Sequence, residues 1–155
     1  DQQLQSLDMR ISALEGNGGS QVKAAAIPVA VEDDGNSSKL LDSAIAKIKA
    51  NKIPSAIADL KEVINSNDKT SAKEAHYYLS IAYVADSKYS NAIDEANKFI
   101  SLSPNSKNVP DAMRVLYTAQ TQMGNNSAAK ATANKLLKSY PSSSAAKKVA
   151  KQINQ

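Results

Sequence analysis

The stretch EAHYYLSIAYVADSKYSNAIDEANKFISLSP, residues 74–104, decides the fold of this chain. Its apolar residues recur at intervals of three and four on both sides of a short polar break near residue 87, which is the pattern of two amphipathic helices. Pro104 follows the second half, and proline ends a helix because it lacks an amide hydrogen and clashes with the preceding turn. The stretch therefore predicts a pair of antiparallel helices.

The same helix pair recurs on either side of this stretch. Small residues open the second helix of each pair at Ala56, Ala92 and Ala129, which are 36 and 37 residues apart. Three further positions repeat at this spacing: Val63, Phe99 and Leu136 in the second helix, Ser43, Leu79 and Leu116 in the first, and Asp68, Pro104 and Pro141 after the second. Helices approach closely only where one side chain is small, so alanines beside large residues indicate packed pairs.

The spacing predicts seven helices, over residues 38–50, 54–66, 71–86, 89–102, 109–123, 126–139 and 142–154. The last has Ala145, Val149 and Ile153 on one face and lysines on the other, which is typical of a helix that caps a repeat stack. The unit resembles the tetratricopeptide repeat, whose length is about 34 residues. The predicted fold class is all-α: three tetratricopeptide (helix-turn-helix) repeats in a right-handed superhelix with a C-terminal capping helix.

The first 37 residues have a different pattern. Leu4, Leu7, Ile11 and Leu14 occupy the a and d positions of two heptads, so residues 1–15 are interpreted as the end of an N-terminal coiled coil. Residues 16–37 contain repeated glycines and no helical period, which predicts a flexible linker. The expected organisation is a coil end over 1–15, a linker over 16–37 and a repeat domain over 38–155.

The composition argues against catalytic chemistry. The 155 residues include no Cys and one His, which excludes a thiol nucleophile, and His76 alone supplies too few ligands for a metal site. Glu32, Asp33 and Asp34 lie in the linker, without the rigid support that acid–base catalysis needs. No hydrolase or nucleotide-binding motif occurs, and no apolar run approaches the roughly 18 residues of a membrane helix. We expect no catalytic residue, no cofactor, no metal and no membrane insertion.

Positive charge is concentrated at the C-terminal end. Residues 1–111 carry 12 basic and 15 acidic side chains, whereas residues 112–155 carry Arg114, six lysines and no acid. Such a segment either attracts acidic partners or forms an ordinary solvated helix face. Because Tyr117 and Tyr140 are its only aromatics and no nucleic-acid motif appears, we do not expect nucleic acid as a partner.

The order of coil, linker and repeats resembles the Tol-Pal-associated YbgF/CpoB family. Four stretches carry the resemblance: LDMRISALE (Leu7–Glu15), EAHYYLSIAY (Glu74–Tyr83), SPNSKNVPDAM (Ser103–Met113) and YPSSSAAKKVAKQI (Tyr140–Ile153). The stretch Glu74–Tyr83 resembles the family's Ala-x-Tyr-Trp-Leu-Gly segment, with Tyr78 in place of Trp and Ser80 in place of Gly. The resemblance covers almost all of the chain outside the linker, although only the end of the family's coil is matched.

The resemblance implies a non-enzymatic periplasmic adaptor. Such a protein binds the inner-membrane protein TolA and a peptidoglycan synthase, and it coordinates outer-membrane constriction with septal peptidoglycan synthesis in cell division. A periplasmic location implies a signal peptide. The polar segment that begins at Asp1 does not have the pattern of a signal peptide, so we expect one that has been cleaved. The resemblance also implies a homotrimer through the full coiled coil, while we expect the repeat domain alone to be monomeric.

Stacked helix pairs form a groove lined by the first helix of each pair. The repeat positions that face it predict a partner-binding groove formed by Glu74, Tyr77, Ile81, Val84, Asp111, Arg114, Thr118 and Gln122. Tyr77 and Arg114 are residue types that often anchor interfaces. Leu41, Ile45 and Ile48 either extend the groove into the first repeat or are buried by the adjoining helix. A groove of this kind suits a peptide with an apolar stretch and some acidic groups.

Two other protein classes fit less well. An alternative is another tetratricopeptide envelope scaffold, such as an outer-membrane protein assembly module. A lipoprotein of that class needs a lipidated Cys, and this sequence has none. A clamp for C-terminal carboxylates needs a ring of Lys, Asn and Arg, and Arg114 and Asn126 alone do not form one.

Overall fold

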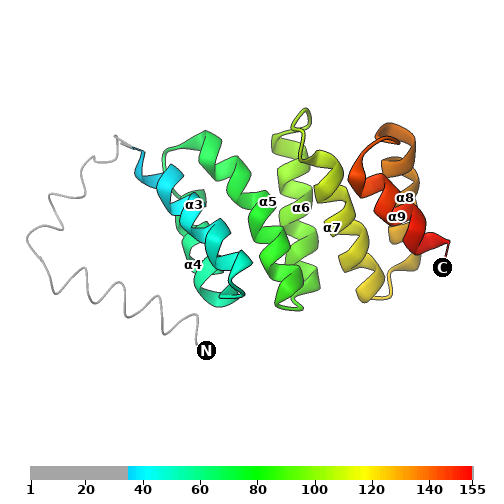
Figure 1. Ribbon diagram of the computed structural model, residues 1–155, viewed down its shortest axis with the longest axis horizontal. Coiled ribbons are helices and arrows are strands. Elements are labelled where there is room, and N and C mark those ends of the chain that lie inside the picture. The colour runs from blue at the N-terminus through cyan, green and yellow to red at the C-terminus, as the bar shows by residue number, and fades with distance from the viewer. Residues whose placement is uncertain (1–34, 155) are drawn as a thin grey trace, which may run out of the picture.

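The computed structural model describes residues 35–154, which form a stack of helices (Figure 1). The helices are α3 (Asn36–Lys49), α4 (Ile53–Ile64), α5 (Lys69–Ala85), α6 (Tyr89–Leu102), α7 (Val109–Gln122), α8 (Asn126–Ser139) and α9 (Ser144–Ile153). Over the described range there is no strand, so the predicted all-α repeat fold is confirmed. The proposed coil residues Leu4, Leu7, Ile11 and Leu14 lie outside the described residues, as do residues 16–34 of the linker.

Three antiparallel helix pairs, α3–α4, α5–α6 and α7–α8, stand in a row in Figure 1, and α9 follows them. Consecutive pairs pack mainly through the second helix of one pair and the first helix of the next, α4 on α5 and α6 on α7. Their first helices also touch, because α5 contacts α3 and α7, and α7 contacts α9. α9 also packs on α8, which is the position expected of the capping helix. None of the helices within residues 35–154 is long and apolar enough to cross a membrane.

Each of these helices begins and ends within two residues of its predicted bounds. Two of the largest differences come from capping side chains. The Asp68 carboxylate accepts a hydrogen bond from the Ser71 amide at 3.1 Å, so α5 begins at Lys69 rather than at residue 71. The Ser143 hydroxyl accepts one from the Ala146 amide at 3.0 Å, so α9 begins at Ser144 rather than at residue 142.

The predicted crossing residues are buried. Ala56 and Ala92 are 0% exposed and Ala129 is 4% exposed. The large residues expected beside them, Val63, Phe99 and Leu136, are also buried. Close helix contact at an alanine with a filled space beside it is therefore the packing rule of all three pairs.

One predicted core position in the first helix of the first pair is exposed. Leu79 and Leu116 are buried as expected, whereas Ser43 is exposed and its neighbour Ala44 is fully buried. Burying a serine hydroxyl would require a hydrogen-bond partner, whereas alanine has no such need. The turn hydrogen bonds keep the repeat spacing of 36 residues, and Ala44 corresponds to Ser80, which is also fully buried, so Ser43 is exposed without a shift of the repeat register.

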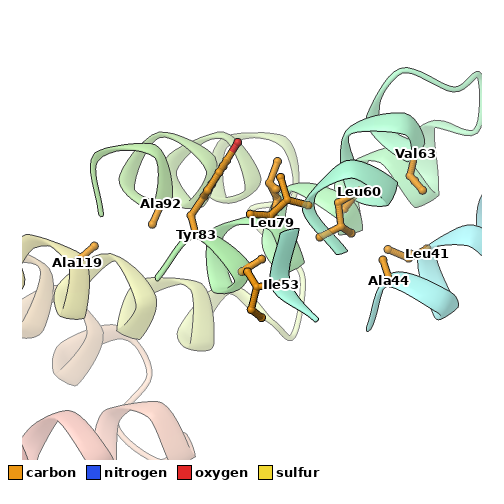
Figure 2. Close-up of a cluster of buried hydrophobic side chains, with 12 residues drawn as sticks. Leu41, Ala44, Ile53, Leu60, Val63, Leu79, Tyr83, Ala92 and Ala119 are labelled. Carbon is orange, nitrogen blue, oxygen red and sulfur yellow. The ribbon is translucent and has the colours of Figure 1, made fainter. Parts of the chain in front are cut away.

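The three residues of the first repeat for which groove and core were both considered all contact the core. Figure 2 shows Leu41 and Ala44 of α3 in one cluster with Leu60 and Val63 of α4. Leu41 is 8% exposed, and Ile45 and Ile48 pack against the same cluster. These three residues therefore contribute to the core, and none of them lines the hollow that is described below.

The turns within the three pairs share one backbone conformation. At each of them the chain enters the left-handed region one residue before the second helix's N-cap, with φ of 61° at Asn51, 59° at Ser87 and 81° at Gly124. An amide then reaches back across the helix end in each turn: Lys52 N–H to Lys47 C=O at 2.8 Å, Lys88 N–H to Tyr83 C=O at 2.8 Å, and Asn125 N–H to Gln120 C=O at 2.9 Å. This is the Schellman arrangement, which satisfies carbonyls at the helix end.

Candidate functional site

A hollow of about 350 Å³ opens between α5, α7 and α9. Its walls are formed by Tyr77, Ile81 and Val84 from α5, Asp111, Arg114, Val115 and Thr118 from α7, and Lys148 from α9. Six of the eight predicted groove residues therefore lie together. The volume is at the lower end of the range of ligand pockets, about 300–1,000 Å³.

Helix periodicity explains why these residues meet. Residues three or four apart share one helix face, which places Tyr77, Ile81 and Val84 together on α5. Arg114 is 37 residues after Tyr77, so it occupies the equivalent place on α7, and α5 and α7 are in contact. The repeat thus brings equivalent positions of neighbouring pairs to one surface.

Tyr77 belongs both to the hollow and to the core. It is 8% exposed, and its ring centroid lies 5.3 Å from that of Phe99 and 4.9 Å from that of Tyr78. Burial raises the pKa of Tyr77 above the usual tyrosine value, and Asp111 raises it further while Arg114 opposes the shift. Its hydroxyl is therefore uncharged at neutral pH and can donate a hydrogen bond.

Arg114 contributes an unpaired donor to the hollow. Its Nε atom is buried, and no hydrogen-bond acceptor is in reach of it in the described structure. A buried donor without a partner costs about 1–3 kcal/mol, and more when the group is charged.

Two other charged residues line the hollow. Lys148 and Asp111 are both exposed, and neither takes part in an ion pair identified between residues 35 and 154. With Arg114 they give the lining two positive charges and one negative charge. The lining itself therefore carries a net positive charge, and Glu74 adds a negative charge beside Tyr77.

Two predicted groove residues are absent from the lining of the hollow, although Glu74 lies close enough to Tyr77 to raise its pKa. The Glu74 carboxylate accepts a hydrogen bond from Asn108 Nδ2 at 3.4 Å, and Gln122 is exposed at the end of α7. Sequence reasoning also missed Val115 and Lys148. Lys148 follows Asp111 by 37 residues, so extending the repeat register into the capping helix would have found it.

His76 has a structural setting between two helices. Its Nδ1 lies 2.6 Å from Glu95 Oε1, and this contact joins α5 to α6. Gln120 joins α7 to α8 in a similar way, because its Oε1 accepts a hydrogen bond from the Thr132 hydroxyl at 2.7 Å. Among residues 35–154, no three His, Cys, Asp or Glu side chains are grouped to hold a metal ion.

A smaller hollow of about 200 Å³ lies between α6, α7 and α8. It is lined by Asn97, Ile100, Met113, Leu116, Ala131, Thr132 and Lys135. Lys135 is the one charged residue of this lining, and no pattern in the sequence predicted a site there. This smaller hollow provides a natural comparison for experiments on the larger one.

The tetratricopeptide repeat family matches residues 118–143, from the middle of α7 to the turn before α9. The chain contains a tetratricopeptide repeat. No curated protein matches the chain. Repeats of this kind stack into extended binding surfaces, so the match and the helical stack together support a scaffold for protein–protein interaction.

Proposed function

We propose that this protein is a non-enzymatic periplasmic adaptor that binds partner proteins in the hollow between α5, α7 and α9. The observation that carries the proposal is the buried, unpartnered Nε of Arg114 beside Tyr77 in an open hollow of a repeat scaffold. Buried tyrosine and arginine side chains are common anchors of protein interfaces.

The proposed partners are a TolA-type inner-membrane protein and a peptidoglycan synthase. Through them the adaptor would coordinate outer-membrane constriction with septal peptidoglycan synthesis during cell division. The support is the resemblance of four stretches, among them Glu74–Tyr83 of α5, to the YbgF/CpoB family. The lack of cysteine suits the oxidising periplasm, where free thiols form disulfides.

The experiment is a calorimetric titration of the full chain with the periplasmic part of TolA at two salt concentrations. Tyr77→Phe and Arg114→Gln change the hollow with little loss of packing, whereas Tyr77→Ala would remove a core ring and cost several kcal/mol. Tyr89→Phe and Lys147→Gln are the matched controls, since neither residue lines the hollow. Because the hollow carries excess positive charge, binding should weaken as salt rises.

We expect saturable binding that Arg114→Gln weakens about tenfold and that both controls leave unchanged. Absence of binding to the unmodified chain at high micromolar concentration would refute the TolA-type partner. Equal binding by all variants would keep the partner and refute the hollow as its site.

A further inference from the structure

Positive charge gathers at the end of the stack formed by α8 and α9, which Figure 1 shows opposite the end formed by α3 and α4. Residues 35–111 carry ten basic and nine acidic side chains, whereas residues 112–154 carry seven basic side chains and no acidic one. One of the seven is Arg114 of α7. The other six, which we call the basic end, belong to α8 and α9: Lys130, Lys135, Lys138, Lys147, Lys148 and Lys151.

The lysines of the basic end have no counter-charge within residues 35–154. All six are exposed, and none takes part in an ion pair identified over this range. Lysines of the earlier helices differ from them, because Lys47 pairs with Asp59 at 2.6 Å and Lys98 pairs with Glu95 at 3.6 Å. The positive charge of the basic end is therefore available to a partner from outside this part of the chain.

The lysines of α9 lie on one face of the helix. Lys151 follows Lys147 by four residues and Lys148 by three, and side chains at these spacings are neighbours on a helix surface. The other face packs into the core, where Ala146 and Val149 are fully buried. Like charges four residues apart repel each other and destabilise the helix. A negatively charged surface laid against this face of α9 would reduce that repulsion.

The residue types of the basic end separate a lipid surface from a protein partner. Protein interfaces are enriched in arginine and aromatic residues and depleted in lysine. The charged residues of α8 and α9 are all lysines, and Tyr140, the one aromatic residue from Asn126 to Asn154, is half-buried and packs against the core. A lysine presents a point charge on a flexible stem, and it is attracted to an anionic bilayer without a fixed geometry. The composition therefore favours the diffuse negative charge of lipid phosphates.

We propose that the basic end binds the surface of an anionic lipid bilayer without inserting into it. The lysine face of α9 lies against the headgroups, while the apolar face of α9 stays in the core. The lysines of α8 add to the attraction, because α8 packs on α9 and a neighbouring helix lies within about one Debye length of the surface. The contact goes beyond the proposed function, since Lys148 is the one lysine of the basic end that also lines the hollow between α5, α7 and α9. It holds the stack with α9 at the bilayer and with α3 at the far end (Figure 1).

Two double variants separate the position of the lysines from the net charge of the chain. Each lysine close to the surface should raise the affinity about fivefold, so a chain with both Lys147→Gln and Lys151→Gln should bind about 30-fold more weakly. Glutamine forms helices about as well as lysine, so α9 stays folded. The matched control carries Lys69→Gln and Lys73→Gln, which are exposed lysines with the same spacing on α5. Both variants have the same net charge.

The test is co-sedimentation of the full chain with two kinds of vesicle, phosphatidylcholine alone and phosphatidylcholine with about a quarter of phosphatidylglycerol, at about 0.05 M and about 0.3 M salt. We expect the chain to bind the anionic vesicles at the lower salt concentration, to lose most of this binding at the higher one and to leave the neutral vesicles unbound. The variant on α9 should bind the anionic vesicles about 30-fold more weakly, and the control variant on α5 should bind them as the unmodified chain does.

Absence of binding to the anionic vesicles at the lower salt concentration would overturn the proposal. An equal loss of binding in the two double variants would also overturn it, because net charge and not the basic end would then govern the contact. Binding of polyglutamate without binding of the vesicles would refute the lipid surface and assign the basic end to an acidic protein. None of these results bears on binding of TolA in the hollow, which is measured without lipid.

Discussion

The three equivalent turns at Asn51, Ser87 and Gly124 predict three different responses to mutation. All three residues have positive φ, but only Gly124 is free of the clash between Cβ and the backbone that this region imposes. A Cβ built on Gly124 would meet nothing within 4 Å, so Gly124→Ala reports the backbone cost alone.

The magnitude follows from two opposing terms. A residue with a Cβ in the left-handed region costs about 1–2 kcal/mol. Alanine also reduces the entropy of the unfolded chain, which returns about 0.4–1 kcal/mol. Gly124→Ala should therefore lower the free energy of unfolding by about 1 kcal/mol and the melting temperature by about 4 °C. Ser87→Gly should raise the free energy of unfolding by about 0.5–1 kcal/mol, because it removes the same clash.

Asn51→Gly should have almost no effect, since asparagine tolerates the left-handed region better than other residues with a side chain. The assay is urea unfolding of the full chain followed by far-ultraviolet circular dichroism. Ala46→Gly is the control, because glycine at this exposed position within α3 should cost about 0.5–1 kcal/mol. If Ser87→Gly destabilised the protein as Ala46→Gly does, the account of the turns would be refuted.

Three further predictions concern capping, alkaline pH and the core. Asp68→Ala should lower the free energy of unfolding by about 1 kcal/mol in the same assay, because the Ser71 amide loses its acceptor. The control Asn67→Ala should leave it unchanged, and equal effects of the two substitutions would contradict the capping role. Burial raises the pKa of Tyr77 in the folded protein above its value in the unfolded chain. The protonated Tyr77 hydroxyl therefore contributes its full share to the free energy of unfolding below a pH of about 10, and this contribution is lost as the pH rises beyond it. Urea unfolding on both sides of that pH should show this loss, and Tyr77→Phe should reduce it; an unchanged pH dependence in the variant would refute the assignment. Leu136→Ala should cost about 2–5 kcal/mol because Leu136 is 0% exposed, and a loss below about 1 kcal/mol would show that the site is not tightly packed.

Much of the fold could be predicted because close contact between helices requires alanine at the crossing positions, and these alanines can be recognised in the sequence. The alanine crossings at Ala56, Ala92 and Ala129 recur at nearly constant spacing, and their burial confirms the repeat. Helix bounds were less exact where capping decided them, as at Asp68, because a cap depends on a single side-chain hydrogen bond. Ser87 carried no signal for its left-handed turn, since serine is not a residue that favours this conformation.

The candidate site could be predicted in part. Tyr77 and Arg114 were expected on one surface because equivalent positions of a repeat face the same way, and both line the hollow. The core contact of Tyr77 with Phe99 was not foreseen, because the side chain is long enough to serve both environments. Lys148 was missed because the repeat register was not extended from Asp111 into the capping helix.

The central claim is that partners bind between α5, α7 and α9, and the lack of cysteine in the sequence allows a direct measurement of it. Thr118→Cys introduces a single cysteine, and a bulky maleimide label on it would fill the proposed site. The same label on Lys135→Cys would fill the smaller hollow between α6, α7 and α8. The affinity of each labelled full-length chain for the periplasmic part of TolA is then compared with that of its unlabelled form. The account predicts that the label abolishes binding at residue 118 and leaves it unchanged at residue 135. Unchanged binding with the label at residue 118 would contradict the claim.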